Sequence, residues 1–199
     1  MIASLHHQPL LVVLRSWEPL ALLPKLERLQ ALGVRHVEVA WSEHAAWIDQ
    51  CQALRSHVPQ CRLGAASVCS LAGVEAAAAA GLEYVVSPVL DYGLVERAKA
   101  LGLALVPGVM SPTEVHQART WGCGVVKLFP AISLGRHYWS RLAAPMGRLP
   151  VCIAAGGLAV SDVQPWLAAG VDAVALGGSL VDDTDWEALA ELVERLRPG

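Results

Sequence analysis

The feature that most constrains this chain is a repeated alternation of two kinds of segment. Short runs rich in β-branched residues, which are typical of strands, alternate with longer segments whose apolar residues recur every three or four positions, as on one face of a helix. Strands that alternate with helices form parallel sheets, so the pattern predicts an α/β fold. The eight strand candidates cover residues 10–15, 36–40, 62–67, 84–88, 104–108, 125–130, 151–157 and 173–179.

The helix candidates fill the segments between these strands. Five glycines stand where a helix would end before the next strand, a place that favours a left-handed residue. They are Gly33, Gly81, Gly102, Gly122 and Gly170. The helix candidates are 18–33, 44–57, 70–81, 91–102, 111–122, 160–170 and 184–197. No helix is predicted before the first strand, where His6 and His7 are expected in a frayed terminus.

Eight βα units in 199 residues predict a closed (β/α)8 TIM barrel with brief loops. No linker interrupts the series, so residues 1–199 are expected to form one domain. The alternative is an open doubly wound sheet. Such a sheet usually has five or six strands and a glycine-rich phosphate loop after its first strand, whereas this first strand continues into LRSWEP.

Composition narrows the class of partner. Hydrophobic residues make up 54% of the chain against 17% charged residues, as in a globular domain with a sizeable core. A formal charge of -3 and the lack of any basic run argue against nucleic acid or an anionic membrane, so a small molecule is expected. No apolar run is long enough for a spanning helix, and no signal peptide is recognised. The five cysteines lack CxxC spacing, which favours reduced thiols, no structural zinc and a cytoplasmic location.

Paired glycines end the last two predicted strands. In a (β/α)8 barrel the active site lies at the carboxyl ends of the strands, and the loops after strands seven and eight often bind phosphate. Gly156-Gly157 and Gly177-Gly178-Ser179 stand at these two places and would present backbone N–H groups to an anion. The alternative for each pair is a plain tight turn.

Lys127 is the most informative residue. The chain has three lysines, and only this one lies inside an apolar strand, VVKLFP. Burial of an ammonium is costly, and desolvation lowers the pKa of a lysine toward the neutral amine that attacks carbonyls. We therefore predict a Schiff-base nucleophile. The alternative is a lysine at a frayed strand end that reaches solvent.

Two further charges interrupt strands. Glu38 lies within HVEVA, where a carboxylate beside Lys127 would serve as a general acid/base, or would form an ion pair with Lys127 or Arg15. Arg15 ends the first strand and is either a ligand for a substrate carboxylate or phosphate, or an exposed strand-end residue. Trp41 follows the second strand and either lines the mouth of the pocket or packs. The seven histidines have no ligand spacing, so no metal is expected.

Seven segments in order resemble the 2-keto-3-deoxy-6-phosphogluconate/4-hydroxy-2-oxoglutarate aldolase family, over essentially the whole chain. They are VEVA (37–40), GAASV (64–68), SPVLD (87–91), PGVMSPTE (107–114), VVKLFPA (125–131), AAGG (154–157) and LGGS (176–179). The resemblance implies a trimeric class I aldolase on a (β/α)8 barrel. Such an enzyme cleaves a 2-keto-3-deoxy sugar acid phosphate to pyruvate and glyceraldehyde 3-phosphate.

The resemblance also implies residue roles. Lys127 matches the Schiff-base lysine, which needs no metal or other cofactor, and Glu38 matches the general acid/base. The two glycine pairs with Ser179 match the phosphate clamp. Pro88 and Phe129 fall in matching segments and are expected to contact substrate, as is Ser67 near the pyruvyl carboxylate.

The chain departs from the family pattern at three places. Glu38-Val39-Ala40-Trp41-Ser42 stands where many members have E-V-T-L-R, so the arginine that holds the substrate carboxylate is missing and Arg15 is expected to replace it. That pattern is similar to the branch that acts on 6-phospho-2-dehydro-3-deoxygalactonate. Ala66 stands where the family has glycine, and Ala155 stands where the family has threonine. The alternatives to an aldolase are a phosphate-binding barrel isomerase or synthase without covalent chemistry, and a non-catalytic binding barrel.

Overall fold

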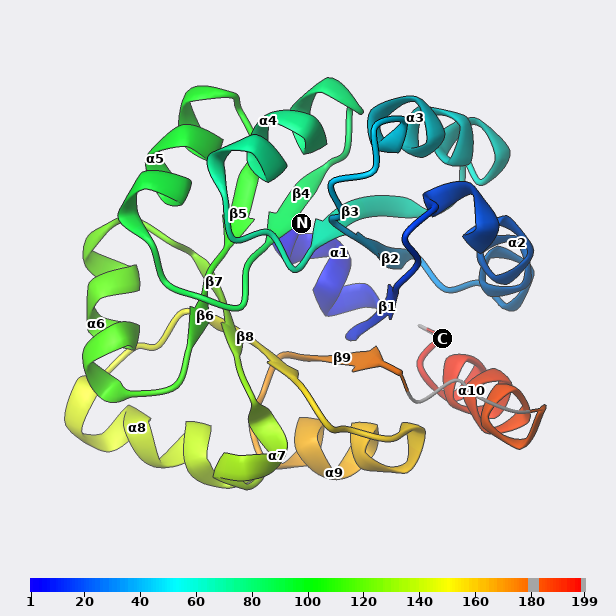
Figure 1. Cartoon of the computed structure of the whole chain (residues 1–199). Coiled ribbons are helices and arrows are strands. Elements are labelled where there is room, and N and C mark those ends of the chain that lie inside the picture. The colour runs from blue at the N-terminus through cyan, green and yellow to red at the C-terminus, as the bar shows by residue number, and fades with distance from the viewer. Residues whose placement is uncertain (179–182, 198–199) are drawn as a thin grey trace.

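The computed structural model describes residues 1–178 and 183–197. These residues contain a fully parallel sheet of nine strands in the order β5-β4-β3-β2-β1-β9-β8-β7-β6, with helices packed around it (Figure 1). The strands are β1 (Leu10–Leu14), β2 (His36–Ala40), β3 (Arg62–Ala66), β4 (Tyr84–Val86), β5 (Ala104–Val106), β6 (Gly108–Val109), β7 (Val125–Leu128), β8 (Val151–Ala155) and β9 (Ala173–Gly177). Each lies within a predicted strand except β6, which extends one residue beyond the predicted strand 104–108.

Two of these segments, β5 and β6, occupy a single strand position. Pro107 separates them because proline has no N–H to donate. The carbonyl of Pro107 still accepts a hydrogen bond from the Lys127 amide at 2.8 Å, and β5 pairs with β4 while β6 pairs with β7. The sheet therefore closes on itself with eight strand positions. The predicted (β/α)8 barrel is confirmed, and the open doubly wound sheet is wrong.

Helices follow the strands as the sequence predicts. The five helix-ending glycines have positive φ angles between 68° and 102°. The helical elements are α1 (Ile2–His7), η1 (Pro19–Leu22), α2 (Leu23–Leu32), α3 (Trp47–His57), α4 (Leu71–Ala79), α5 (Tyr92–Ala100), α6 (Pro112–Thr120), α7 (Ala131–Leu134), α8 (Tyr138–Met146), η2 (Val160–Asp162), α9 (Val163–Ala168) and α10 (Asp183–Arg195).

The chain terminus before β1 is a helix, and the expectation of a frayed end is wrong. Figure 1 shows α1 lying across the middle of the ring of strands. Leu5 is fully buried and joins the apolar cluster inside the barrel. Ser4 Oγ lies 2.8 Å from Nε2 of His36, which is itself buried on β2. Packing inside the barrel opening thus holds a helix of six residues that would be unstable alone.

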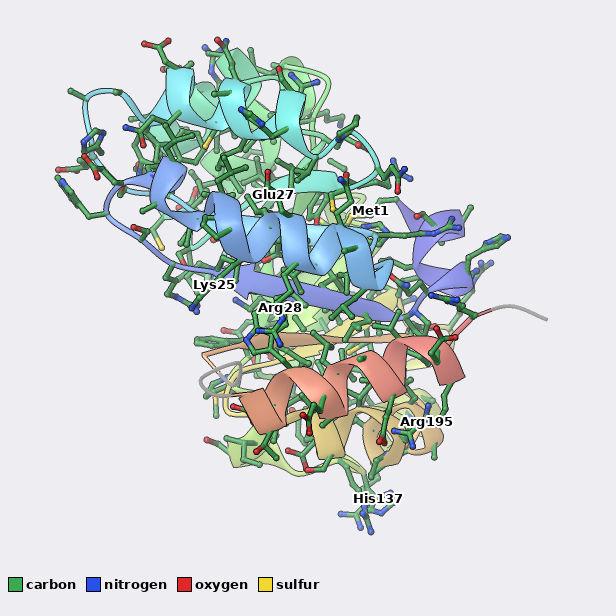
Figure 2. All side chains as sticks on the ribbon, turned by 90° about the vertical axis from the view of Figure 1, so that its right-hand side faces the viewer. Met1, Lys25, Glu27, Arg28, His137 and Arg195 are labelled. Carbon is green, nitrogen blue, oxygen red and sulfur yellow. The ribbon has the colours of Figure 1, made fainter. Side chains whose placement is uncertain are left out.

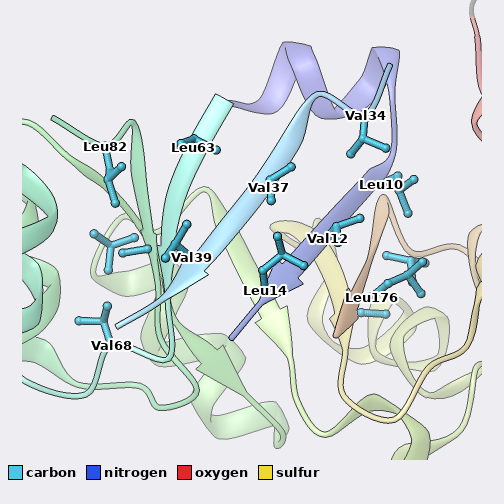
Figure 3. Close-up of a cluster of buried hydrophobic side chains, with 14 of the residues drawn as sticks. Leu10, Val12, Leu14, Val34, Val37, Val39, Leu63, Val68, Leu82 and Leu176 are labelled. Carbon is cyan, nitrogen blue, oxygen red and sulfur yellow. The ribbon is translucent and has the colours of Figure 1, made fainter. Parts of the chain in front are cut away.

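Side chains of the strands alternate between two apolar clusters. Those pointing outward pack under the helices, and Figure 3 shows Leu10, Val12 and Leu14 of β1 with Val37 and Val39 of β2 in this layer. Those pointing inward fill the barrel. Inward positions are where a polar side chain is costly, and they include His36, Glu38, Tyr84 and Lys127.

The first and last helices of the helical ring lie along β1. Figure 2 shows α2 and α10 on its two sides, with Arg28 between them. The Arg28 guanidinium carbon lies 4.4 Å from the ring centre of Trp186 on α10, a cation–π contact. Strand β1 pairs with β2 on one side and β9 on the other, so the first and last strands of the chain lie next to each other in the barrel.

Two further findings bear on the sequence predictions. Among the described residues, no helix is long and apolar enough to cross a membrane. All five cysteines are free thiols, four of them buried and Cys69 exposed.

Candidate active site

Glu38 projects from β2 into the barrel. It is 1% exposed, and in the register of the sheet it lies beside Val13 of β1 and Gly64 of β3. Burial raises the pKa of the Glu38 carboxyl from 4.5 to about 7, although the positive charges of Lys127 and Arg15 act in the opposite direction. Desolvation is therefore the larger effect, and Glu38 exchanges its proton near neutral pH.

Lys127 projects into the same space from β7. It is 7% exposed, so the alternative of a strand-end lysine that reaches solvent is wrong. Its Nζ lies 4.4 Å from the centre of the Phe129 ring. Burial lowers the pKa of Lys127, and Arg15 lowers it further, while Glu38 and Cys69 oppose the change. The neutral amine, which is the nucleophilic form, is thereby favoured.

Arg15 lies at the mouth of the barrel, just beyond the end of β1. Its side chain is exposed to solvent and lies against the neighbouring strand β9, because a Cβ at Gly177 would lie only 3.1 Å from its Nη1. The charge of Arg15 acts on both Glu38 and Lys127. Arg15 is thus an exposed residue at the end of a strand whose charge acts on Glu38 and Lys127 inside the barrel.

A cavity of about 410 Å³ opens at this mouth. It is lined by Arg15, Ser16, Trp17, Ala40, Trp41, Ser42 and Ser67. Trp41 fills both roles that the sequence left open, since it lines the cavity and also packs edge to face against Trp47 at 4.9 Å. Ser42 Oγ donates to the carbonyl of Trp17 at 3.0 Å and so joins two loops of the mouth.

Ser67 has an unusual backbone. Its φ of 59° lies in the left-handed region, which non-glycine residues seldom occupy and which concentrates at functional sites. This supports the prediction that Ser67 contacts a ligand. Pro88 stands further along the rim, where its carbonyl packs so closely on Gly108 that no side chain would fit there.

The glycine pairs lie at the rim, at the carboxyl ends of β8 and β9. Gly156 and Gly157 have φ angles of 96° and 78°, and a Cβ at Gly156 would lie 2.9 Å from the Phe129 ring. Gly178 has a φ of 81° and open space where its side chain would be. A cavity of about 140 Å³ reaches Gly178 from Arg15. Ser179 lies outside the described residues.

Apart from Ser179, the predicted site residues lie inside the barrel or at the carboxyl ends of its strands. Within residues 1–178 and 183–197, no three His, Cys, Asp or Glu side chains are grouped as a metal site would require. Sequence reasoning missed Tyr84, which is fully buried inside the barrel against Gly64, and Trp17 at the mouth. The signal for Tyr84 was a glycine within an apolar strand, which often marks a close approach.

The fold and the site define a (β/α)8 barrel that carries a buried lysine and a buried carboxyl group in its interior. The family model described as "Aldolase: KDPG and KHG aldolase" matches residues 1–194. The chain therefore belongs to the KDPG and KHG aldolase family.

Curated relatives and a solved structure agree with this family. The chain is 28% identical over 182 residues to the 2-dehydro-3-deoxy-phosphogluconate aldolase of Haemophilus influenzae, covering 88% of this chain and 84% of that one. It is 26% identical to the 2-dehydro-3-deoxy-6-phosphogalactonate aldolase of Escherichia coli, covering 86% and 84%. It superimposes on the 2-keto-3-deoxy-6-phospho-gluconate aldolase of Zymomonas mobilis with a TM-score of 0.81, 26% identity, and coverage of 100% and 98%. Aldolases are carbon–carbon lyases, so the isomerase and binding-barrel alternatives are not favoured.

Proposed function

We propose that Lys127 and Glu38 are the catalytic pair of a class I aldolase in this chain. The observation that carries the proposal is their joint burial inside the barrel, with burial moving both pKa values toward neutrality. A buried amine with a lowered pKa beside a buried carboxyl with a raised pKa suits imine chemistry, which needs a nucleophile and a proton carrier in one place.

The proposed reaction needs no metal. The neutral amine of Lys127 attacks the C2 ketone of a 2-keto acid, and Glu38, as the acid, protonates the departing hydroxyl so that water leaves and an iminium forms. Glu38, now a carboxylate, takes the proton from the C4 hydroxyl as the C3–C4 bond breaks and the aldehyde departs. The electron pair passes to the iminium and gives an enamine. Protonation at C3 and hydrolysis then release pyruvate and return the free amine.

The proposed substrate is a 2-keto-3-deoxy sugar acid phosphate. The rim glycines Gly156, Gly157, Gly177 and Gly178 would receive the phosphate, and Arg15 would hold the carboxylate end that Ser42 cannot hold. Relatives are named for both the gluconate and the galactonate compound, so both are candidates here. The aldehyde product of either would be glyceraldehyde 3-phosphate, and 4-hydroxy-2-oxoglutarate is the smaller, unphosphorylated candidate.

Reductive trapping tests this function. Pyruvate with borohydride is expected to label the protein irreversibly, and peptide mapping is expected to find the adduct on Lys127. Lys127→Met should abolish the label. Lys99→Met serves as the matched control, because Lys99 is an exposed residue of α5 and its removal should leave labelling unchanged. Labelling that persists in Lys127→Met would contradict the assignment.

We also propose that the chain assembles as a homotrimer in the cytoplasm. The family likeness supports both parts of this proposal. Exposed apolar side chains on three consecutive connections at the rim support the trimer: Leu71 at the start of α4, and Val89 and Met110 in loops. Contact between chains would cover such residues.

A further inference from the structure

Two buried polar atoms inside the barrel have no hydrogen-bond partner among the described residues. They are Nδ1 of His36 and the hydroxyl oxygen of Tyr84. A buried polar group without a partner costs free energy comparable to a lost hydrogen bond, so native interiors rarely leave two of them near one another. An ordered water is the usual partner where the surroundings are polar.

The geometry brings both atoms to one space beneath Glu38. Tyr84 of β4 pairs in register with Gly64 of β3, which pairs in turn with Glu38 of β2. The Tyr84 atoms nearest to Gly64 are Cε2, Cζ and Cδ2, in contact so close that any side chain at Gly64 would overlap them. The Tyr84 ring therefore lies over β3 on the inner face of the sheet, in the space that the missing side chain of Gly64 leaves. Its hydroxyl, carried on Cζ, extends toward β2.

His36 closes this space from the other side. It lies two residues before Glu38 on β2, so both side chains point into the barrel. The His36 and Tyr84 ring centres are 6.1 Å apart with planes at 60°. Ser4 of α1 already binds Nε2 of His36, which leaves Nδ1 directed to the interior.

We propose that a water molecule bridges Tyr84 and His36 and donates a hydrogen bond to the Glu38 carboxylate, so that Tyr84 is a positioning residue for the acid/base. The hydrogen bonds balance. The water accepts from the Tyr84 hydroxyl and donates one hydrogen to Nδ1 of neutral His36 and the other to Glu38. Burial lowers the pKa of His36 to about 4, which keeps the imidazole neutral and Nδ1 able to accept. The catalytic consequence rests on the proposed function.

Several charged or titratable groups face Glu38 from the strands around it. They are Lys127 on β7, Arg15 after β1, Tyr84 on β4 and His36 on β2. Burial raises the pKa of the Tyr84 hydroxyl well above its ordinary value, and the Glu38 carboxylate raises it further, so the hydroxyl remains a hydrogen-bond donor. Because the water would stabilise the charged form of Glu38, its loss should raise the pKa of Glu38.

The experiment compares Tyr84→Phe with the parent by carbon-13 NMR titration of the glutamate side-chain carboxyls. The Glu38 resonance is identified as the one missing in Glu38→Gln. Tyr84→Phe is expected to raise the pKa of Glu38 by about 0.5 to 1 pH unit, the size of one net hydrogen bond. The acid limb of the activity profile should move by the same amount, while pyruvate trapping on Lys127 is retained. Tyr92→Phe is the matched control, because it removes a hydroxyl from an exposed tyrosine, and it should move nothing.

A second variant guards against a change in packing at Tyr84. His36→Leu removes the acceptor nitrogen from the other side of the proposed water and should also raise the pKa of Glu38. A Glu38 titration that matches the parent in both variants overturns the inference. The outcome is separate from the proposed function: absence of trapping in the parent would refute the aldolase mechanism, whereas the carboxyl titration decides the role of Tyr84 in either case.

Discussion

The opposite charge nearby favours the charged form of both Glu38 and Lys127, yet the pKa of each is shifted in the direction that favours the neutral form. Burial outweighs attraction in both cases, since the pKa of Glu38 is raised to about 7 in spite of Lys127 and Arg15, and the pKa of Lys127 is lowered in spite of Glu38. Removing water from the two groups is thus the stronger effect. In the proposed mechanism, the neutral pair is the state that begins imine formation, with an amine to attack and an acid to protonate.

A first prediction separates the roles of the pair. Glu38→Gln keeps the size of the side chain but cannot exchange a proton. Turnover should fall roughly 100- to 10,000-fold, the usual contribution of a general acid/base. Some pyruvate trapping on Lys127 should remain. Solvent-deuterium exchange into pyruvate measures the proton step directly, and exchange at the parent rate would move the role to another group.

A second prediction concerns stability against pH. The pKa of Glu38 is raised on folding, from 4.5 to about 7, so between these values the folded chain holds a proton that the unfolded chain has lost. The free energy of unfolding therefore falls as pH rises through this window, by roughly 3 kcal/mol. Glutamine does not titrate. Glu38→Gln should be increasingly stabilising, relative to glutamate, from pH 4.5 to pH 7.

The comparison is best made in a Lys127→Met background, which keeps the lysine charge from changing together with Glu38. Without that lysine the window should extend to higher pH, because Lys127 lowers the pKa of Glu38. Urea unfolding at several pH values gives the measurement. If the difference in the free energy of unfolding between the two variants stays constant from pH 4.5 to pH 8, the pKa of Glu38 is not raised on folding.

At the scale of elements, α1 covers one opening of the barrel. Leu5 is fully buried inside the barrel opening, whereas Ile2 on the same helix is 39% exposed. Leu5→Ala should therefore lower the free energy of unfolding by about 2 to 5 kcal/mol, as truncations of buried leucines do. Ile2→Ala, the matched control, should cost about 1 kcal/mol or less. Equal losses in urea titrations would mean that α1 does not seal the barrel.

The elements that the sequence failed to predict share a physical cause. Helix α1 has six residues with one buried apolar side chain, and α7 has four residues, so neither shows a helical period. Helix α8 contains Pro145, which ordinarily argues against a helix interior. Tertiary contacts hold these segments. The strands, in contrast, were predictable because their continuous apolar runs are buried on both faces.

At the scale of the whole molecule, the site residues that the sequence predicts are those whose charge is unusual within an apolar strand. Lys127 and Glu38 are charges within apolar strands, and the sequence alone marks them as costly. Tyr84 is not unusual in this way, because a tyrosine suits a strand. Its place depends on the missing side chain of Gly64 on the neighbouring strand, a relation that appears only when the register is known.

The proposed trimer gives a prediction at the same scale. Val89 and Met110 are exposed on neighbouring rim loops, and charged replacements would be costly only if another chain covered them. The double variant Val89→Glu/Met110→Glu should shift the mass measured by light scattering from trimer to monomer. Exposed Leu20, on η1 after β1, offers the control Leu20→Glu, which should leave the mass unchanged. A double variant that remains trimeric would place the interface elsewhere.

The pairing of β1 with β9 has a consequence for synthesis on the ribosome. Strand β1 emerges early, but one of its two neighbours is the last strand of the sheet, so the ring stays open until nearly the whole chain has been made. Water enters an open ring, and an amine in water keeps its proton. Lys127 therefore keeps its proton on the nascent chain, and burial favours the neutral amine only after the final strand has closed the ring.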